Sequence, residues 1–153
     1  VRARYDFVLF DCPAAMDFRV VSALMSSDWV IIPTSASTLD LKGAINFIPQ
    51  VLKYADPVRF NPDLQFLGIL LSRVQRNTVL SRDAQEWLGE EFEELVFEHM
   101  VHASIRYKEL PGYQALIFDH APGWAEDYEG VTGEILERLG LNPHTHAHAE
   151  RGG

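Results

Sequence analysis

An acidic residue that closes an apolar run near the start of the chain is the first candidate for chemistry. The run Tyr5–Phe10 is followed at once by Asp11, Cys12 and Pro13. A run rich in β-formers and bounded by a turn signal predicts a strand buried on both faces of a parallel sheet. Asp11 would then lie at the carboxyl end of that strand, the edge where open α/β sheets bind ligands. In nucleotide hydrolases an acidic residue at this edge serves a Mg²⁺-bound phosphate.

Simpler interpretations of these residues stay open. Aspartate also suits the loop or helix N-cap that follows many strands, so the local pattern does not decide the role of Asp11. Cys12 has the side chain of a nucleophile, and Cys12 with Arg19 approaches the phosphate loop of tyrosine phosphatases. The arginine comes one residue too late for that loop, because Phe18 stands where it is needed. We therefore expect Cys12 to be a small buried residue at a strand end.

Composition limits the classes of protein that the chain can represent. Its 153 residues, 47% of them hydrophobic, suit one domain with a core. A net charge of −9 opposes general attraction to DNA or anionic lipid and leaves only a local basic patch for such a role. A single cysteine excludes an internal disulfide, and the absence of a signal-peptide pattern predicts a cytoplasmic location. No apolar run approaches the roughly 20 residues of a membrane span.

Apolar periodicity predicts further strands and helices in alternation. Buried strands are expected at Trp29–Pro33 and Phe66–Ser72, with a short one at Leu95–Val101 and an ambiguous apolar stretch at Ala115–Phe118. Helices are expected at about 18–27, 39–54, 81–94 and 124–139. Such alternation predicts an α/β fold with a mainly parallel, doubly wound sheet and helices on both faces.

Details of these helices can also be predicted. Thr38 or Asp40 is expected to cap the second helix, and Pro49 to kink or shorten it. The aromatic side chains of Trp87, Trp124 and Tyr128 stand at helical spacings, which favours a place in the core. Residues 1–140 are expected to form the domain, and 141–153 a disordered tail. A solvated tail is a better interpretation of its His144, His146 and His148 than a metal site, because nothing orders the ligands.

Several segments taken together resemble a known family. Tyr5–Pro13 resembles a Walker B segment ending in Asp-Cys-Pro-Pro, and Leu67–Leu71 a Gly-Ile-Leu-Leu strand. Arg76–Thr78 with Leu80 and Ser81 resembles the Arg-Thr and Leu-Ser sequel of that strand. The segments occur in the order found in the C-terminal half of the ParA/MinD-type partition ATPases, and the resemblance is closest to the ParA branch. The fold implied is P-loop NTPase-like, without its N-terminal P-loop unit.

This resemblance implies ATP and Mg²⁺ as ligands. Asp11 would hold Mg²⁺ through water, and Cys12 and Pro13 would belong to the segment that senses the γ-phosphate. His102 and Ser104 occupy the run that lies beside the adenine in the family. The resemblance further implies a homodimer, a ParB-like partner protein and non-specific DNA. The basic candidates for DNA contact are Arg73, Arg76, Arg82 and Arg106.

One feature of the family is missing from the chain. No Gly-x-x-x-x-Gly-Lys-[Ser/Thr] loop occurs in the sequence, so nothing in it cradles a triphosphate. We therefore expect no catalytic residue for ATP hydrolysis within this chain. Two functions remain: the C-terminal part of a ParA-like ATPase acting in plasmid or chromosome partition, or an interaction and dimerisation domain that keeps the fold without binding nucleotide.

Overall fold

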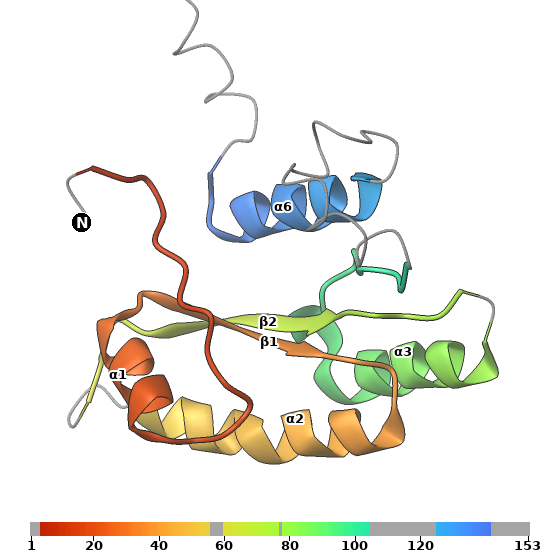
Figure 1. Cartoon of the computed structure of the whole chain (residues 1–153), viewed down its shortest axis with the longest axis horizontal. Helices are drawn as coiled ribbons and strands as arrows, with labels where there is room; N and C mark the ends of the chain where they lie inside the picture. Colours follow the sequence, from red (N-terminus) through yellow and green to blue (C-terminus); the bar gives the residue numbers. More distant parts are fainter. Residues whose placement is uncertain (1–3, 56–59, 77, 105–124, 142–153) are drawn as a thin grey trace, which may run out of the picture. The chain divides into compact units, whose positions relative to one another are not determined.

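A computed structural model describes residues 4–55, 60–76, 78–104 and 125–141 of the chain (Figure 1). The chain divides into two compact units. The first unit is Val1–Val30 with Ile45–Phe66, and the second is Ile31–Ala44 with Leu67–Gly153. The elements follow in the order α1 (Phe18–Ser26), β1 (Trp29–Thr34), α2 (Thr38–Leu52), the 3₁₀ turn η1 (Lys53–Ala55), β2 (Gln65–Leu71), α3 (Val79–Phe92), the 3₁₀ turn η2 (Glu93–Leu95) and α6 (Glu126–Arg138).

Strands β1 and β2 are hydrogen-bonded neighbours and run parallel. The Gln65 N–H donates to Asp28 O at 2.9 Å, and the Ser72 N–H donates to Thr34 O at 2.7 Å. Parallel strands joined through a helix are the α/β pattern that the sequence predicts, so the fold class is confirmed. Both predicted strands form within one residue of their expected bounds.

The expected strand at Leu95–Val101 forms only in part. Residues 96–103 run beside β2 and the residues that follow it. Isolated parallel bridges pair Ile69 of β2 with Val96, and Val74 with His102. The Phe97 N–H donates to Ile69 O at 2.9 Å and the Val101 N–H to Leu71 O at 3.0 Å. The intervening residues leave the ladder, so this segment follows the sheet without becoming a continuous strand.

In the first unit, α1 forms where its apolar spacing predicts. The Asp17 carboxylate caps its start by accepting from the backbone N–H groups of Arg19 and Val20. Val20 and Leu24 are buried on one face of the helix. At the other end, the Asn61 side chain donates to the carbonyl oxygens of Leu24, in the last turn, and of the C-cap residue Ser27, at 2.8 and 2.7 Å.

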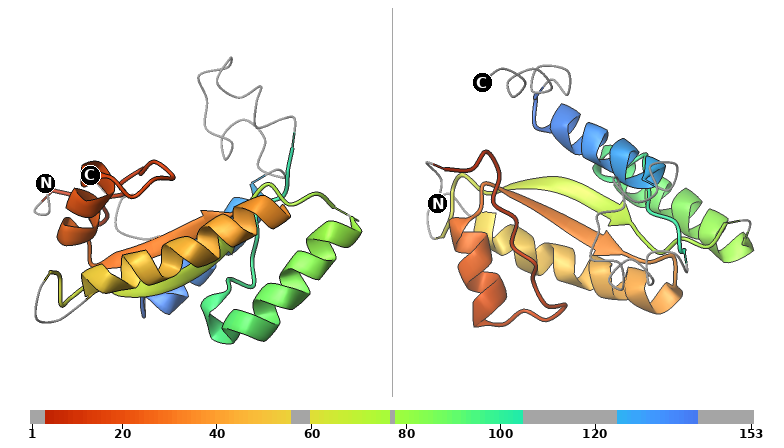
Figure 2. Two further views of the ribbon diagram at one scale, coloured as in Figure 1. Left: turned by 90° about the horizontal axis from the view of Figure 1, so that it is seen from below. Right: turned by 45° about the horizontal axis from the view of Figure 1, so that its top comes forward.

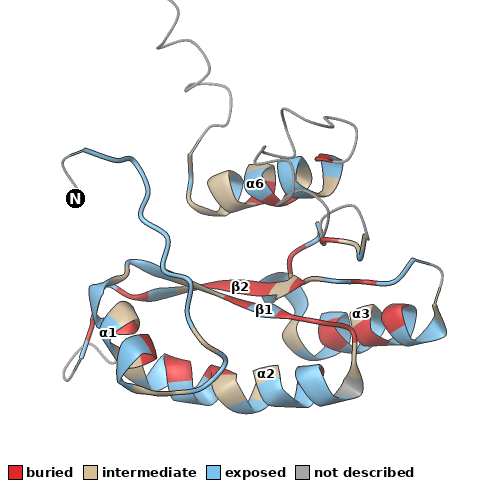
Figure 3. Cartoon of the chain, in the orientation of Figure 1, coloured by how far each residue is buried: buried red, intermediate tan, exposed pale blue. Residues whose placement is uncertain are grey.

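The prediction of a buried strand at Tyr5–Asp11 is wrong for this structure. Residues 5–11 form neither helix nor strand and are exposed, with Leu9 at 93% (Figure 3). A strand needs neighbours to pair its backbone N–H and C=O groups, and no described residue forms a bridge with this segment. The apolar pattern therefore marks a segment suited to burial that the described residues leave uncovered. Cys12 is exposed too, which corrects the expectation that it is buried.

Helix α2 begins with a different cap from the one predicted. Ser37, not Thr38 or Asp40, precedes the helix: its Oγ accepts from the Asp40 N–H at 3.1 Å and its carbonyl from the Leu41 N–H at 3.0 Å. Pro49 lies inside the helix, which continues to Leu52 before passing into η1, so the helix is not shortened at the proline.

In the second unit, α3 and α6 flank β2 on opposite faces (Figures 1 and 2). Thr78 caps α3, since its Oγ1 accepts from the Ser81 N–H, and Ala84 and Leu88 are buried. Trp87 and Tyr128 are exposed, so the prediction that they belong to the core is wrong. Trp87 instead packs edge-on against Phe92, with ring centroids 6.3 Å apart.

Helix α6 ends at Arg138, and Gly140 closes the turn that follows it. Gly140 has φ +70°, the left-handed conformation that glycine adopts most easily. The Gly140 N–H donates to Glu137 O and the Leu141 N–H to Leu136 O, both at 2.8 Å, which is a Schellman motif. Trp124, Ala115–Phe118 and the tail from residue 142 lie outside the described residues. No helix in the described ranges has the length and apolarity to cross a membrane.

Candidate functional site

The carboxyl end of β2 carries three of the predicted basic residues, all within the second unit. Arg73 is the second residue after β2 and has φ +53°, a conformation that costs energy for any residue other than glycine. Its guanidinium lies 3.6 Å from Asp40, in the first turn of α2. Such strained backbone concentrates at functional sites in proteins. Arg76 is the next basic residue in this loop, and Arg82 is the fourth residue of α3.

A carboxylate of α6 joins Arg76 to His102. Asp127 Oδ2 accepts from the backbone N–H of His102 at 2.8 Å, and the His102 ring Nδ1 lies 3.1 Å from both carboxylate oxygens. Arg76 Nη2 approaches the same carboxylate at 3.9 Å. Burial raises the pKa of Asp127, but the His102 hydrogen bonds and the charges of His102 and Arg76 outweigh it and hold that pKa below its ordinary value. Asp127 is thus an ionised acceptor shared by two predicted site residues.

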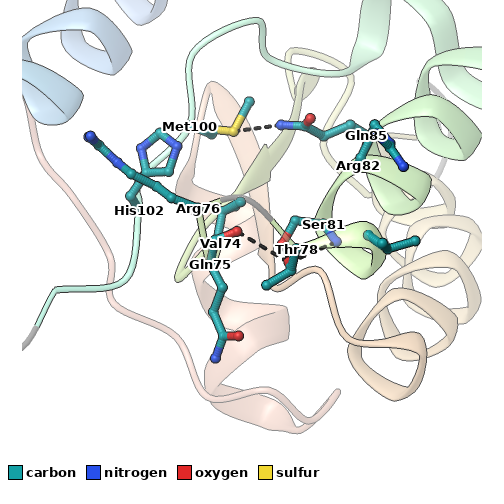
Figure 4. A pocket seen from close by; sticks show the side chains of 10 residues that line it. Val74, Gln75, Arg76, Thr78, Ser81, Arg82, Gln85, Met100 and His102 are labelled. Carbon is teal, nitrogen blue, oxygen red and sulfur yellow. Dashed lines mark hydrogen bonds between the residues drawn. The ribbon is translucent and has the colours of Figure 1, made fainter.

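A pocket of about 470 Å³ opens beside this cluster (Figure 4). Arg76, Arg82 and His102 supply its basic groups and Thr78 and Ser81 its hydroxyls, and none of its described lining residues carries a carboxylate. The Gln85 side chain donates to Met100 Sδ at 2.7 Å across the pocket. Apolar atoms with basic and hydroxyl groups suit a planar or anionic ligand. The other lining residues are Val74, Gln75 and Val79.

A second carboxylate binds α6 to the same extended segment. Glu134 accepts from the backbone N–H groups of Glu98 and His99 at 3.0 and 2.8 Å and from the His99 ring at 3.0 Å. Asp127 and Glu134 are seven residues apart, which places them on one face of the helix two turns apart. Sequence reasoning missed both residues. One detectable signal was that the last helix carries the two acids Asp127 and Glu134, and that the segment opposite carries the two histidines His99 and His102.

The predicted metal residue Asp11 lies in the first unit with an exposed side chain, followed by exposed Cys12 and half-buried Pro13. The described residues contain no cluster of three or more His, Cys, Asp or Glu side chains able to hold a metal. Mg²⁺ often keeps several water ligands and takes one or two carboxylates, so a single exposed aspartate fits a water-mediated contact. The triphosphate does not fit, because the sequence has no glycine-rich loop with a lysine to receive it.

Two predicted residues lie at or beyond the end of the described segment. Ser104 is half-buried and is its last described residue, two positions after His102. Arg106 lies outside the described residues. The structure thus brings Arg76 and His102 together through Asp127 and places Arg73 on Asp40.

The chain is similar in sequence to a family model and to several known proteins. A family model described as an AAA domain matches residues 1–66. An uncharacterized protein of Mycobacterium tuberculosis is 34% identical over 140 residues, which cover 90% of this chain and 43% of that protein. The chromosome-partitioning ATPase Soj of Thermus thermophilus is 30% identical, over 88% of this chain and 54% of its own length. The chromosome partitioning protein ParA of Myxococcus xanthus is 29% identical, over 89% and 48%.

The fold has a solved counterpart. A McdA variant from Cyanothece in complex with ATP superposes with a TM-score of 0.64 at 20% identity, over 81% of this chain and 47% of that one. At this identity the similarity shows the fold alone. The chain spans about half the length of the relatives it matches.

Proposed function

Since the chain is a relative of the ParA-type partition ATPases and spans about half of their length, we propose that it acts in plasmid or chromosome partition as part of such an ATPase. Residues outside the 153 would supply the phosphate-binding loop. The observation that carries the proposal is the cluster at the carboxyl end of β2, where Arg76, Asp127 and His102 meet beside a pocket. Parallel α/β sheets bind ligands at that edge.

The nucleotide is assigned to two places in the chain. Asp11 would hold Mg²⁺ through water, and Cys12 and Pro13 would form the turn that responds to the nucleotide. His102 and Ser104 lie on the side of the base. When bound, Mg²⁺ would supply neutralisation of phosphate charge. The residues of this chain would contact the metal and the base but not receive the triphosphate, and they include no group assigned to the chemical step.

The basic residues at the carboxyl end of β2 are assigned to DNA. Arg73, Arg76 and Arg82 belong to one loop and the helix that follows it, and their charges stand out in a chain of net charge −9. Arginine side chains that contact phosphates give affinity without sequence preference. We further propose that Arg106 contacts DNA, and that the chain forms a homodimer and binds a ParB-like partner protein, as its resemblance to the ParA-type family implies.

The test uses the longest native polypeptide that contains these residues. With Mg²⁺ and ATP it should form a dimer by light scattering and release phosphate, and Asp11→Asn should reduce both strongly. Asp6→Asn is the matched control, because it removes the same charge from the same exposed segment. If ATP changes neither the mass of the wild-type particle nor its phosphate release, the proposal fails. The chain is then an interaction domain that keeps the fold without nucleotide.

A further inference from the structure

We propose that α6 keeps the chain from pairing with a second copy of itself along one edge of its sheet. The edge concerned is the side of residues 96–102 that faces away from β2, which we call the outer edge. An uncovered strand edge presents a row of N–H and C=O groups that other chains can pair with, and proteins cover such edges with helices or loops. The inference concerns backbone groups and needs no nucleotide, so it does not rest on the proposed function.

The backbone of this segment faces two sides in turn. On one side, the N–H groups of Phe97, Val101 and Ala103 donate to carbonyl oxygens of β2 and of the residues after it, at 2.9, 3.0 and 2.9 Å. In a strand each residue directs its N–H and C=O to the same side, and its neighbours direct theirs to the other side. The even-numbered residues of the segment therefore present their backbone groups to the outer edge.

Arg138 of α6 lies at the start of the outer edge. Its guanidinium donates to the carbonyl oxygen of Val96 at 2.7 Å and to that of Glu94, just before the segment, at 3.0 Å. Both acceptors belong to even-numbered residues. An added strand would bring its N–H groups to these same oxygens, so the guanidinium takes the place of a strand's donors.

Two carboxylates of α6 lie further along the outer edge. Glu134 accepts from the Glu98 N–H at 3.0 Å, and Asp127 accepts from the His102 N–H at 2.8 Å. These donors again belong to even-numbered residues. Glu134 also accepts from the His99 N–H at 2.8 Å, where the segment leaves its ladder with β2. One helix thus supplies donors to the carbonyl groups and acceptors to the N–H groups of the same edge.

Once uncovered, the outer edge fits a second copy of the same segment running antiparallel. With Met100 opposite Met100 of the copy, Glu98 lies opposite His102, and each pair joins even-numbered residues, whose backbone groups face outward. An acidic side chain opposite a basic one favours an antiparallel pair, whereas the register that sets Glu98 opposite Glu98 brings like charges together. Such a pair has two-fold symmetry and closes as a dimer.

The experiment removes the two carboxylates and measures association. Asp127→Ala with Glu134→Ala uncovers the outward N–H groups. Glu129→Ala with Glu137→Ala is the matched control, because it removes the same charge from exposed positions of the same helix. Both are made in the longest native polypeptide that contains these residues and are measured without ATP, so that nucleotide-dependent dimerisation does not contribute. Light scattering should show a twofold rise in particle mass for the uncovered variant and none for the control or the wild type.

A disulfide across the two-fold axis reports the register. Opposite residues of a hydrogen-bonded antiparallel pair have Cα atoms about 5.5 Å apart, within the range that a disulfide spans. Met100→Cys is therefore introduced, with Cys12 and any other native cysteine replaced by serine. Under mild oxidation the uncovered variant should form the intermolecular disulfide several times more than the wild-type background does.

Asp127→Ala alone is a milder variant, because it leaves the contact between Glu134 and Arg138 in place. If the uncovered variant shows no cooperative thermal transition, mass and disulfide are measured on the milder one. A folded variant that stays a monomer without the disulfide overturns the inference. So does a disulfide that forms equally in the wild-type background, because the outer edge is then not covered. A rise in mass without the Met100→Cys disulfide also overturns it, since the copies then associate through another surface.

Discussion

Gly68 of β2 leaves the space that the guanidinium of Arg138 occupies. A Cβ added at Gly68 would lie 2.9 Å from Arg138 Nη1 and 2.6 Å from Leu95 O, closer than side chains approach. Through this gap Arg138 donates to the carbonyl oxygens of Leu67, Glu94 and Val96 at 3.0, 3.0 and 2.7 Å. One arginine of the last helix thus satisfies backbone groups of β2 and of the segment beside it.

Substitution of Gly68 should therefore destabilise the second unit. Gly68→Ala adds the clashing Cβ at a residue with φ +150°, where side chains are strained, and we expect a loss of about 2 kcal/mol or more. Gly89→Ala in α3 is the control, because nothing lies within 4 Å of its added Cβ and alanine favours helix. It should be neutral or stabilising by about 0.5 kcal/mol. Urea unfolding of both variants checks this, and equal losses would contradict it.

Loss of the Arg138 side chain should be equally damaging. Arg138→Ala leaves Glu134, a buried residue, without the guanidinium that donates to its Oε1 at 2.8 and 3.0 Å. Breaking such a pair on one side costs about 3 kcal/mol. Arg138→Lys should recover only part of the loss, since an ammonium lacks the planar fork and the stacking on Phe97, 4.2 Å from Arg138 Cζ. Full recovery by lysine would show that charge alone matters.

Acid should weaken the attachment of α6. Burial raises the pKa of Glu134, but hydrogen bonds from His99, Glu98 and Arg138 outweigh it and hold that pKa below its ordinary 4.5. A carboxyl whose folded pKa is depressed stabilises the fold above its unfolded pKa and loses that contribution as pH falls through the folded value. The free energy of unfolding should thus decline below about pH 4.5, and less steeply in Glu134→Gln. Identical slopes would contradict this assignment.

The cap of α2 predicts a local effect at Ser37. Ser37→Ala removes the hydroxyl oxygen that receives the Asp40 N–H and should cost about 1 kcal/mol. Ser37→Asn is the restoring variant, because asparagine is an equally good N-cap residue. Thermal unfolding distinguishes them, and a loss of stability in both would mean that the side-chain cap is not the cause.

The exposure of Cys12 predicts its reactivity. As the single cysteine of the chain, it should react with a thiol reagent in native buffer, with one equivalent consumed and no need for denaturant. If the proposed function is correct, Mg²⁺ and ATP should slow this reaction in the longest native polypeptide. A thiol that reacts only after unfolding would show that residues 5–12 are covered in solution.

Local patterns by themselves determined the strands β1 and β2 and the positions of the helices. Short-range rules act within one segment: Val20 and Leu24 fall on one face of α1, and Gly140 closes the turn after α6, whatever the rest of the chain does. The order of the motifs also predicted the ParA-type relationship. Asp11, Cys12 and Pro13 remain predictions as site residues.

Only the tertiary structure decided which residues meet. Asp127 is one of three acids in the first turn of α6, and nothing in its local sequence distinguishes it from Glu126 or Glu129. Its partners lie far away along the chain: Arg76 is 51 residues before it and His102 is 25 residues before it. The exposure of residues 5–11 was likewise not predictable, because the burial of a strand depends on neighbours that its own residues do not specify.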